Sequence, residues 1–240
     1  EAHLGLGMVM AHRGDYTNAQ IAFNKALDLR PDFAVAQLNL AAAKYKNGEL
    51  LAAENTYQEI INSHPESAAA HTGLGIVLLS AGKPKKATEA FRLAVKLDPT
   101  QGEAWMNIAS SPEPNISESD IKRIEEMTED TRVSTEARIA MLFALGELAE
   151  RKGQYNNAFA IFEKANQARQ RRMKAFDQIF DPNAINQLER AIKNNYTRMS
   201  SSSHSVNNTQ QPVFVLGMPR SGSTLIAQII ASHQNAESRG

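Results

Sequence analysis

The side chains best suited to chemistry lie together in one short segment, Gly217-Met218-Pro219-Arg220-Ser221-Gly222-Ser223-Thr224. Arg220 contributes a permanent cation with a planar fork of N–H donors, and Ser223 and Thr224 add hydroxyl donors. Gly222 lets the backbone come close to a ligand, because it has no side chain. These are the groups that bind a phosphate-like anion, so we interpret this segment as a candidate anion-binding loop.

The residues around the loop predict the elements that would position it. Val213 to Leu216 follow Pro212 as a short β-branched and aromatic run, which is typical of a buried strand. Leu225, Ile226, Ile229 and Ile230 then recur at helical spacing. A strand, a glycine-bearing loop and a helix N-terminus in this order direct free backbone N–H groups and the helix dipole at an anion.

The loop differs at one position from the P-loop of nucleoside triphosphatases. Gly217 and Gly222 have the required separation, but Ser223 occupies the position of the lysine that reaches the β- and γ-phosphates. The pattern therefore argues against kinase or triphosphatase chemistry. It favours a nucleotide whose charge is met by Arg220 instead.

The string from Pro219 to Leu225 resembles the 5′-phosphosulfate-binding loop of sulfotransferases. It is closest to the tyrosylprotein-sulfotransferase type and to sulfotransferases that carry N-terminal tetratricopeptide repeats. The resemblance implies transfer of a sulfuryl group from 3′-phosphoadenosine 5′-phosphosulfate (PAPS) to a hydroxyl acceptor, without a metal. It assigns Arg220 as the catalytic residue, and it assigns PAPS binding to Pro219, Arg220, Ser221, Gly222, Ser223 and Thr224.

The resemblance also implies parts of an active site that this segment does not supply. The helix ends in Ser232-His233, as in the family, and the family's glutamate base would fall just after Gly240. The 3′-phosphate site would also lie downstream. We therefore expect the chain to be a truncated piece of a sulfotransferase and to be inactive by itself.

A repeat of 34 residues dominates the first hundred positions. Small residues, aromatics and prolines all recur at this step: Gly14, Gly48 and Gly82; Ala19, Ala53 and Ala87; Phe23, Tyr57 and Phe91; Pro31, Pro65 and Pro99. This period identifies the tetratricopeptide repeat, a pair of helices that stacks on its neighbours. We expect Gly7, Ala41 and Gly75 to allow close helix contact, and the aromatics to fill the space between repeats.

The pattern divides the chain into segments. We predict a solenoid over residues 1–172 that is degenerate at 110–138, where Pro112 and Pro114 break the repeat. A capped helix is expected over 117–130 and a full repeat over 139–172. Additional helices follow at 173–199, a polar linker at 200–211, and the truncated start of a P-loop α/β sulfotransferase domain at 212–240. The predicted fold class is mainly α, an α-solenoid followed by one strand, loop and helix.

The concave face of such a solenoid binds peptides or proteins. The inward positions are Leu4, Met8, Leu38, Asn39, Ala42, Thr72, Gly73 and Ile76. Lysine and arginine are missing from them, so they do not form a carboxylate clamp. An apolar helix or strand, or the protein's own downstream segment, could fill the groove.

Composition narrows the class of protein. The 240 residues carry 26 Lys and Arg against 26 Asp and Glu, so nothing indicates a nucleic-acid partner, and no apolar run is long enough to span a membrane. The absence of cysteine excludes thiolate chemistry and disulfides. The six histidines have no metal spacing. We expect a cytoplasmic sulfotransferase with an interaction domain. The alternatives are a repeat scaffold without catalysis and a P-loop phosphotransferase that lacks its lysine.

Overall fold

The computed structural model describes residues 1–175, 187 and 190. The chain divides into two units, Glu1–Ile179 and Phe180–Gly240. The described residues form ten α-helices and no strand, which confirms the mainly α class. Residues 200–240, with the predicted linker, strand, loop and helix, lie outside the described residues, as do nearly all of 173–199.

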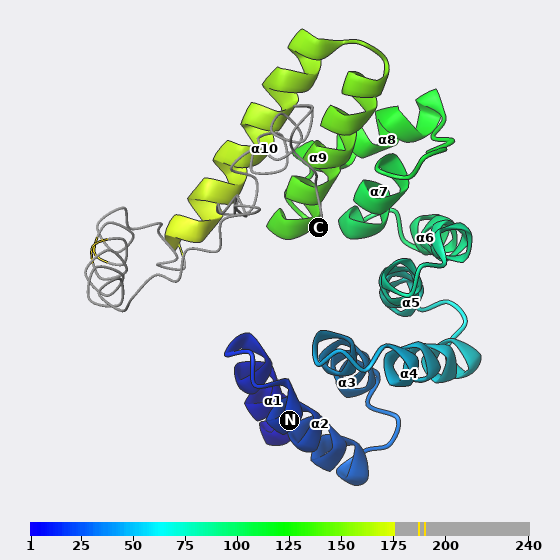
Figure 1. Cartoon of the computed structure of the whole chain (residues 1–240), viewed down its shortest axis with the longest axis vertical. Helices are drawn as coiled ribbons and strands as arrows, with labels where there is room; N and C mark the ends of the chain where they lie inside the picture. The colour runs from blue at the N-terminus through cyan, green and yellow to red at the C-terminus, as the bar shows by residue number, and fades with distance from the viewer. Residues whose placement is uncertain (176–186, 188–189, 191–240) are drawn as a thin grey trace, which may run out of the picture. The chain divides into compact units, whose positions relative to one another are not determined.

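The first six helices form three helical hairpins (Figure 1). Their bounds are α1 Ala2–His12, α2 Tyr16–Leu29, α3 Ala34–Lys46, α4 Leu50–Ser63, α5 Ala68–Ser80 and α6 Pro84–Leu97. The second helix of each hairpin also packs against the first helix of the next, so the pairs make one continuous stack. Each hairpin turns at a glycine with positive φ, namely Gly14, Gly48 and Gly82, which a residue with a side chain adopts at a cost.

Glycines inside the helices allow the hairpins to close. A Cβ on Gly7 would lie 2.5 Å from the Phe23 ring, and one on Gly75 would lie 2.5 Å from the Phe91 ring. Both phenylalanines are almost completely buried. The close helix contact expected at Gly7 and Gly75 is therefore confirmed, whereas Phe23 and Phe91, which we expected between repeats, pack inside their own hairpins and belong to the buried clusters.

A second repeated contact ties each hairpin to the turn before it. One side-chain N–H donor recurs at the same repeat position and reaches the carbonyl oxygen of the proline six residues earlier. The pairs are Gln37 with Pro31 at 2.8 Å, His71 with Pro65 at 2.9 Å and Trp105 with Pro99 at 2.8 Å. A carbonyl oxygen only accepts, so His71 donates through Nε2. The hydrogen bond gives the buried His71 a structural role in the solenoid.

The fourth repeat departs from the pattern. Helix α7 (Gly102–Ala109) is short, and α8 (Glu118–Glu129) begins after a loop at the predicted break. In the described part of the chain α8 makes no helix contact with α7; instead α9 (Thr135–Arg151) packs directly on α7. Helices α9 and α10 (Tyr155–Ala175) form a last hairpin, whose turn is at Gly153. This hairpin is the repeat expected at 139–172, and α9 begins four residues early.

Helix α8 begins as its sequence predicts. Ser117 caps it by accepting a hydrogen bond from the Asp120 N–H at 3.1 Å, and Asp120 Oδ2 accepts one from the Ser117 N–H at 3.1 Å. This reciprocal arrangement is a capping box. Among the described helices, none is long and apolar enough to cross a lipid bilayer.

Candidate functional site

The predicted phosphosulfate loop cannot be placed against other groups. Pro219, Arg220, Ser221, Gly222, Ser223 and Thr224 all lie outside the described residues. Their roles stay predictions from the sequence. The described residues include the positions that the sequence predicted for the groove.

The predicted groove residues come from α1, α3 and α5, and they differ in their access to solvent. Met8 is half exposed, and Leu38, Ala42 and Ile76 are partly exposed. Thr72 and Gly73 are buried, and the space beside Gly73 is filled by the Tyr57 ring, 2.3 Å from the position of a Cβ. These two residues are therefore not accessible to a ligand, contrary to the expectation that they lie on the binding face.

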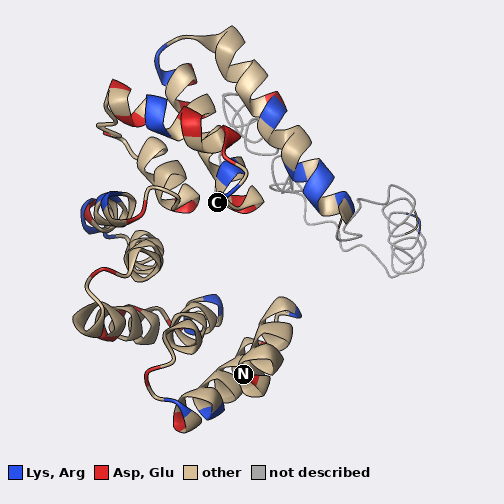
Figure 2. Cartoon of the chain, turned by 180° about the vertical axis from the view of Figure 1, so that it is seen from behind, with Lys and Arg blue, Asp and Glu red and all other residues tan. Residues whose placement is uncertain are grey.

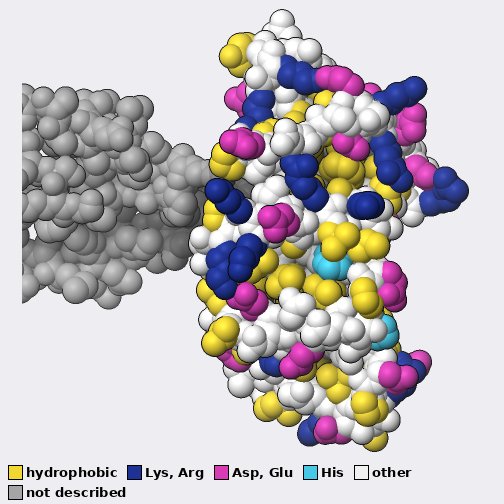
Figure 3. Space-filling view, turned by 90° about the vertical axis from the view of Figure 1, so that its right-hand side faces the viewer, with side chains coloured by type: hydrophobic (Ala, Val, Ile, Leu, Met, Phe, Trp, Pro, Cys, Tyr) yellow, Lys and Arg dark blue, Asp and Glu magenta, His cyan; other side chains and the backbone are white. Residues whose placement is uncertain are grey.

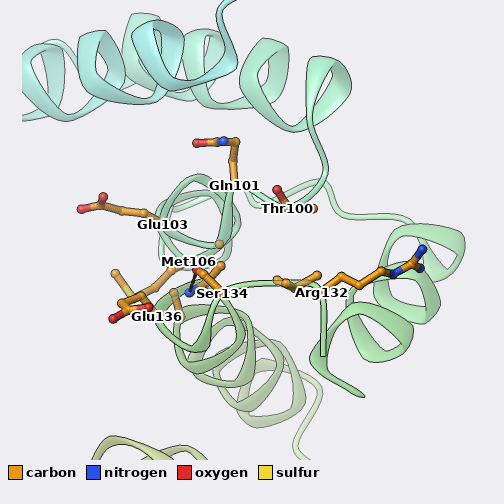
Figure 4. Close-up of a pocket in the computed structure, with 11 residues that line it drawn as sticks. Thr100, Gln101, Glu103, Met106, Arg132, Ser134 and Glu136 are labelled. Atoms are coloured by element: carbon orange, nitrogen blue, oxygen red, sulfur yellow. Dashed lines mark hydrogen bonds between the residues drawn. The ribbon is translucent and has the colours of Figure 1, made fainter. Parts of the chain in front are cut away.

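The structure also has a cavity that the sequence did not reveal. The cavity measures about 650 Å³ and lies between the N-terminal ends of α7 and α9 and the loop that precedes α9 (Figure 4). Met106 lines it and stands 34 residues after Thr72, at the repeat position that Leu4 and Leu38 also occupy. The cavity exists because α9, and not α8, packs on α7. We call it the α7–α9 pocket.

One edge of the α7–α9 pocket is held by Asp98. Its Oδ1 accepts hydrogen bonds from the Thr100 N–H at 2.9 Å and hydroxyl at 2.7 Å, and its Oδ2 accepts one from Gln101 Nε2 at 2.8 Å. Burial raises the pKa of Asp98, but the bonds from Gln101 and Thr100 outweigh it and hold the pKa below its usual value. Gln101 Oε1 also lies 3.2 Å from the Thr72 hydroxyl, which links α5 to this edge.

Charged groups at the α7–α9 pocket are mostly paired. Arg132 bonds Asp130 at 2.7 Å and, with its backbone N–H, lowers the pKa of that partly exposed carboxyl to about 2. Glu136 bonds Arg172 of α10; a backbone hydrogen bond first, and Arg172 second, lower its pKa. Lys and Arg segments are visible along α10 in Figure 2. Glu103 accepts a hydrogen bond from Asn107 Nδ2 with its backbone oxygen at 2.8 Å, but within the described structure its side-chain carboxylate has no hydrogen bond or ion pair.

The arrangement suits binding better than catalysis. Met106, Ala137 and Ala140 provide apolar wall, and Glu103 provides one unpaired negative charge in the first turn of α7. The residues described here include no group of His, Cys, Asp and Glu that could hold a metal. A side chain with an apolar stem and a positive end fits such a pocket.

Comparison with protein families agrees with both parts of the sequence. Models described as tetratricopeptide repeat match residues 1–33, 38–102 and 139–171. A model described as sulfotransferase family matches residues 212–240, the range that contains the predicted loop. The unmatched range 103–138 contains α7 and α8, where the structure departs from the repeat.

Curated relatives share the repeats. An uncharacterized protein of Aquifex aeolicus is 26% identical over 190 residues, which is 73% of this chain and 23% of that protein. The small glutamine-rich tetratricopeptide repeat-containing protein 2 of Mycosarcoma maydis is 31% identical over 105 residues, 44% of this chain and 30% of that protein. The chain thus spans less than a third of the length of these relatives.

A solved structure shows the same fold. The pilF protein of Pseudomonas aeruginosa superposes with a TM-score of 0.52 at 18% identity, covering 70% of this chain and 75% of that one. At this identity the likeness concerns the fold alone.

Proposed function

We propose that this chain, with its tetratricopeptide repeats and sulfotransferase-like segment, is part of an enzyme that transfers a sulfuryl group from PAPS to a hydroxyl acceptor. Its repeats hold a peptide or protein partner. The observation that carries the proposal is the sulfotransferase match over residues 212–240, which coincides with a loop of the right donor chemistry. The proposal includes a cytoplasmic location, in keeping with a chain that has no cysteine.

The donor set of the loop fits a phosphosulfate. Arg220 offers a fixed cation, Ser221, Ser223 and Thr224 offer hydroxyls, and Gly222 keeps the backbone N–H groups accessible. PAPS, when bound, supplies the sulfuryl group. Arg220 then neutralises charge that grows on the oxygens of the donor during transfer, which is the kind of contact that is stronger in the transition state than in the ground state.

The repeats support the partner role. Helices α1, α3 and α5 carry the solvent-accessible Met8, Leu38 and Ile76, and the α7–α9 pocket adds Met106 and Glu103. The partner we propose is an apolar peptide segment that carries a lysine or arginine at one end. Glu103 meets the positive charge, and the groove covers the apolar side chains.

Substitution of Arg220 in the intact protein tests the catalytic half. Arg220→Ala should abolish PAPS-dependent sulfation, because a hydrogen bond to a charged group is worth about 1.5 to 3 kcal/mol in binding, and more is lost in the transition state. Arg220→Lys should rescue only part of the rate, since a point charge does not reproduce the planar fork. Thr224→Ala should cost less, as one hydroxyl among several.

The assay measures turnover with labelled PAPS and, separately, PAPS affinity, with circular dichroism as the folding control. Arg13→Ala is the matched control, because Arg13 is an exposed arginine at the end of α1. Near-normal turnover of Arg220→Ala would exclude the phosphosulfate loop and leave the scaffold without catalysis. We keep the scaffold without catalysis as the alternative function, because every described helix belongs to the repeat region.

A peptide-binding assay tests the proposed role of the repeats independently of catalysis. Apolar peptides with and without a terminal lysine should differ in affinity for the wild-type chain, and Glu103→Gln should remove the difference. Met106→Asp should weaken both peptides. Equal binding of both peptides to the wild-type chain would contradict the charge assignment while leaving the catalytic proposal untouched.

A further inference from the structure

A second cavity lies on a different surface of the solenoid, where the repeat pattern breaks. It measures about 280 Å³ and is lined by residues of α6, α7, α8 and the loop before α8. We call it the α6–α8 pocket. It shares no residue with the α7–α9 pocket or with the 219–224 loop.

Three solvent-exposed cations line the α6–α8 pocket. Arg92 and Lys96 stand one turn apart on α6, and Arg123 lies on α8. Within the described structure Lys96 and Arg123 have no ion pair or hydrogen bond, and Arg92 donates one bond, to the Pro114 carbonyl oxygen at 3.1 Å. Like charges at this helical spacing repel each other. An anion between them would remove that cost.

The one carboxylate at the α6–α8 pocket is already engaged. Asp120 Oδ2 accepts hydrogen bonds from the Ser117 N–H at 3.1 Å and the Ser117 hydroxyl at 2.6 Å. It therefore serves the capping box of α8 and does not pair with the three cations. In the first turn of α8 the Asp120 N–H is bonded to Ser117 Oγ in the cap, and the proposal below does not rest on the helix N-terminus.

The floor of the α6–α8 pocket is apolar. Val95, Trp105, Ile108 and Ile116 line it, and Trp105 and Ile108 are only 4% and 2% exposed. The Trp105 N–H is bonded to Pro99, so the indole offers only its apolar surface. Figure 3 faces the side of α6 and α8 and shows Lys and Arg side chains around apolar ones in its upper half. The pocket thus combines a cationic rim with an apolar floor.

The loop that breaks the repeat builds this pocket. Asn115 and Ile116 belong to it, and Arg92 fixes the loop through Pro114. Asn115 has φ of 44°, and among the described residues it is the one non-glycine residue with positive φ. Such a conformation is uncommon outside glycine and is maintained only where the surrounding structure imposes it.

We propose that the α6–α8 pocket binds the oxyanion of a sulfate or phosphate monoester, with the apolar or aromatic group of the ester on its floor. Lys96, Arg123 and the remaining donors of Arg92 contact the oxyanion. Guanidinium and ammonium groups recognise such anions through charge-assisted hydrogen bonds. The proposal does not depend on catalysis by the 219–224 loop.

Calorimetric titration of the whole chain with phenyl sulfate, phenyl phosphate and phenol tests the site. Both esters should bind and phenol should not, and added salt should weaken both. Lys96→Gln combined with Arg123→Gln should weaken binding by at least about ten-fold, since one charge-assisted bond alone is worth about that factor. Lys85→Gln combined with Lys86→Gln is the matched control, because both lysines are exposed on α6 outside the pocket and the change in net charge is the same.

Each outcome of these titrations either supports or overturns the proposal. Tighter binding of one ester assigns the site to sulfate or to phosphate esters, and either result supports it. Absence of binding by both esters overturns the proposal, as does equal binding of phenol. Equal loss in the two double variants would show attraction to net charge only and would also overturn it. Circular dichroism of each variant verifies that the helices are retained.

Discussion

Replacement of Gly102 by alanine tests the close packing of α7 on α9. Gly102 is the first residue of α7, and a Cβ there would lie 2.3 Å from the Ala137 carbonyl oxygen and 2.7 Å from its Cα. Both neighbours are backbone atoms of α9, so no flexible side chain can move aside. The new methyl group must push the two helices apart.

Two opposed effects determine how much Gly102→Ala changes the free energy of unfolding. Forced overpacking typically costs about 1 to 3 kcal/mol. Alanine is favoured over glycine by up to about 1 kcal/mol in a helix interior, and by less at the first residue. We therefore expect Gly102→Ala to lower the free energy of unfolding by about 1 to 2 kcal/mol. Gly5→Ala is the control: Gly5 lies inside α1 with no atom within 4 Å of its Cβ position, so alanine should stabilise by roughly 0.5 to 1 kcal/mol.

Hydrogen exchange is the decisive assay, because repeats unfold partly independently of one another. Gly102→Ala should speed amide exchange in α7, α9 and α10 while leaving α1 to α4 unchanged. A thermal scan should show a drop of about 2 to 4 °C per kcal/mol for a domain of this size. Unchanged or slower exchange in α9 would refute the close contact and, with it, the walls of the α7–α9 pocket.

Three further predictions concern single groups. Burial first, and the charge of Glu103 second, raise the pKa of Tyr57 to about 12, so stability should hold up to about pH 10 and fall as the pH rises toward 12; Tyr57→Phe should flatten this fall in denaturant titrations. The pKa of Asp98 is lowered in the folded chain, so the stability that Asp98 contributes should be present above the usual pKa of an aspartate and lost as the pH falls through the lowered pKa. Asp98→Asn should remove this acid dependence of the melting temperature. Ser117→Ala should destabilise α8 by about 0.5 to 2 kcal/mol, seen as faster amide exchange there, whereas equal exchange in Ser117→Ala and the neighbouring control Ser119→Ala would contradict the capping role.

Local patterns in the sequence predict most of the helices. The glycine turns, the buried aromatics and the Ser117 cap were all readable, because each depends on residues within one repeat or one helical turn. The family matches confirm the repeats and the sulfotransferase likeness. The roles of Arg220 and its loop neighbours stay predictions. The buried state of Thr72 and Gly73 was missed, because a repeat position alone does not say that the Tyr57 ring fills the space beside Gly73.

The sequence by itself determined where the repeat helices turn and which small residues allow them to approach, since these features recur at a fixed period. Only the tertiary structure decided what happens at the break. There Gly153 falls three positions later than two further 34-residue steps from Gly82 would place it, and α9 replaces α8 as the neighbour of α7. The partners Gly102 and Ala137 lie far apart in the chain, and no local pattern tells which helix will pack on a shortened one. Both pockets lie at this break: one is lined by α7 and α9, and the other by α6, α7 and α8.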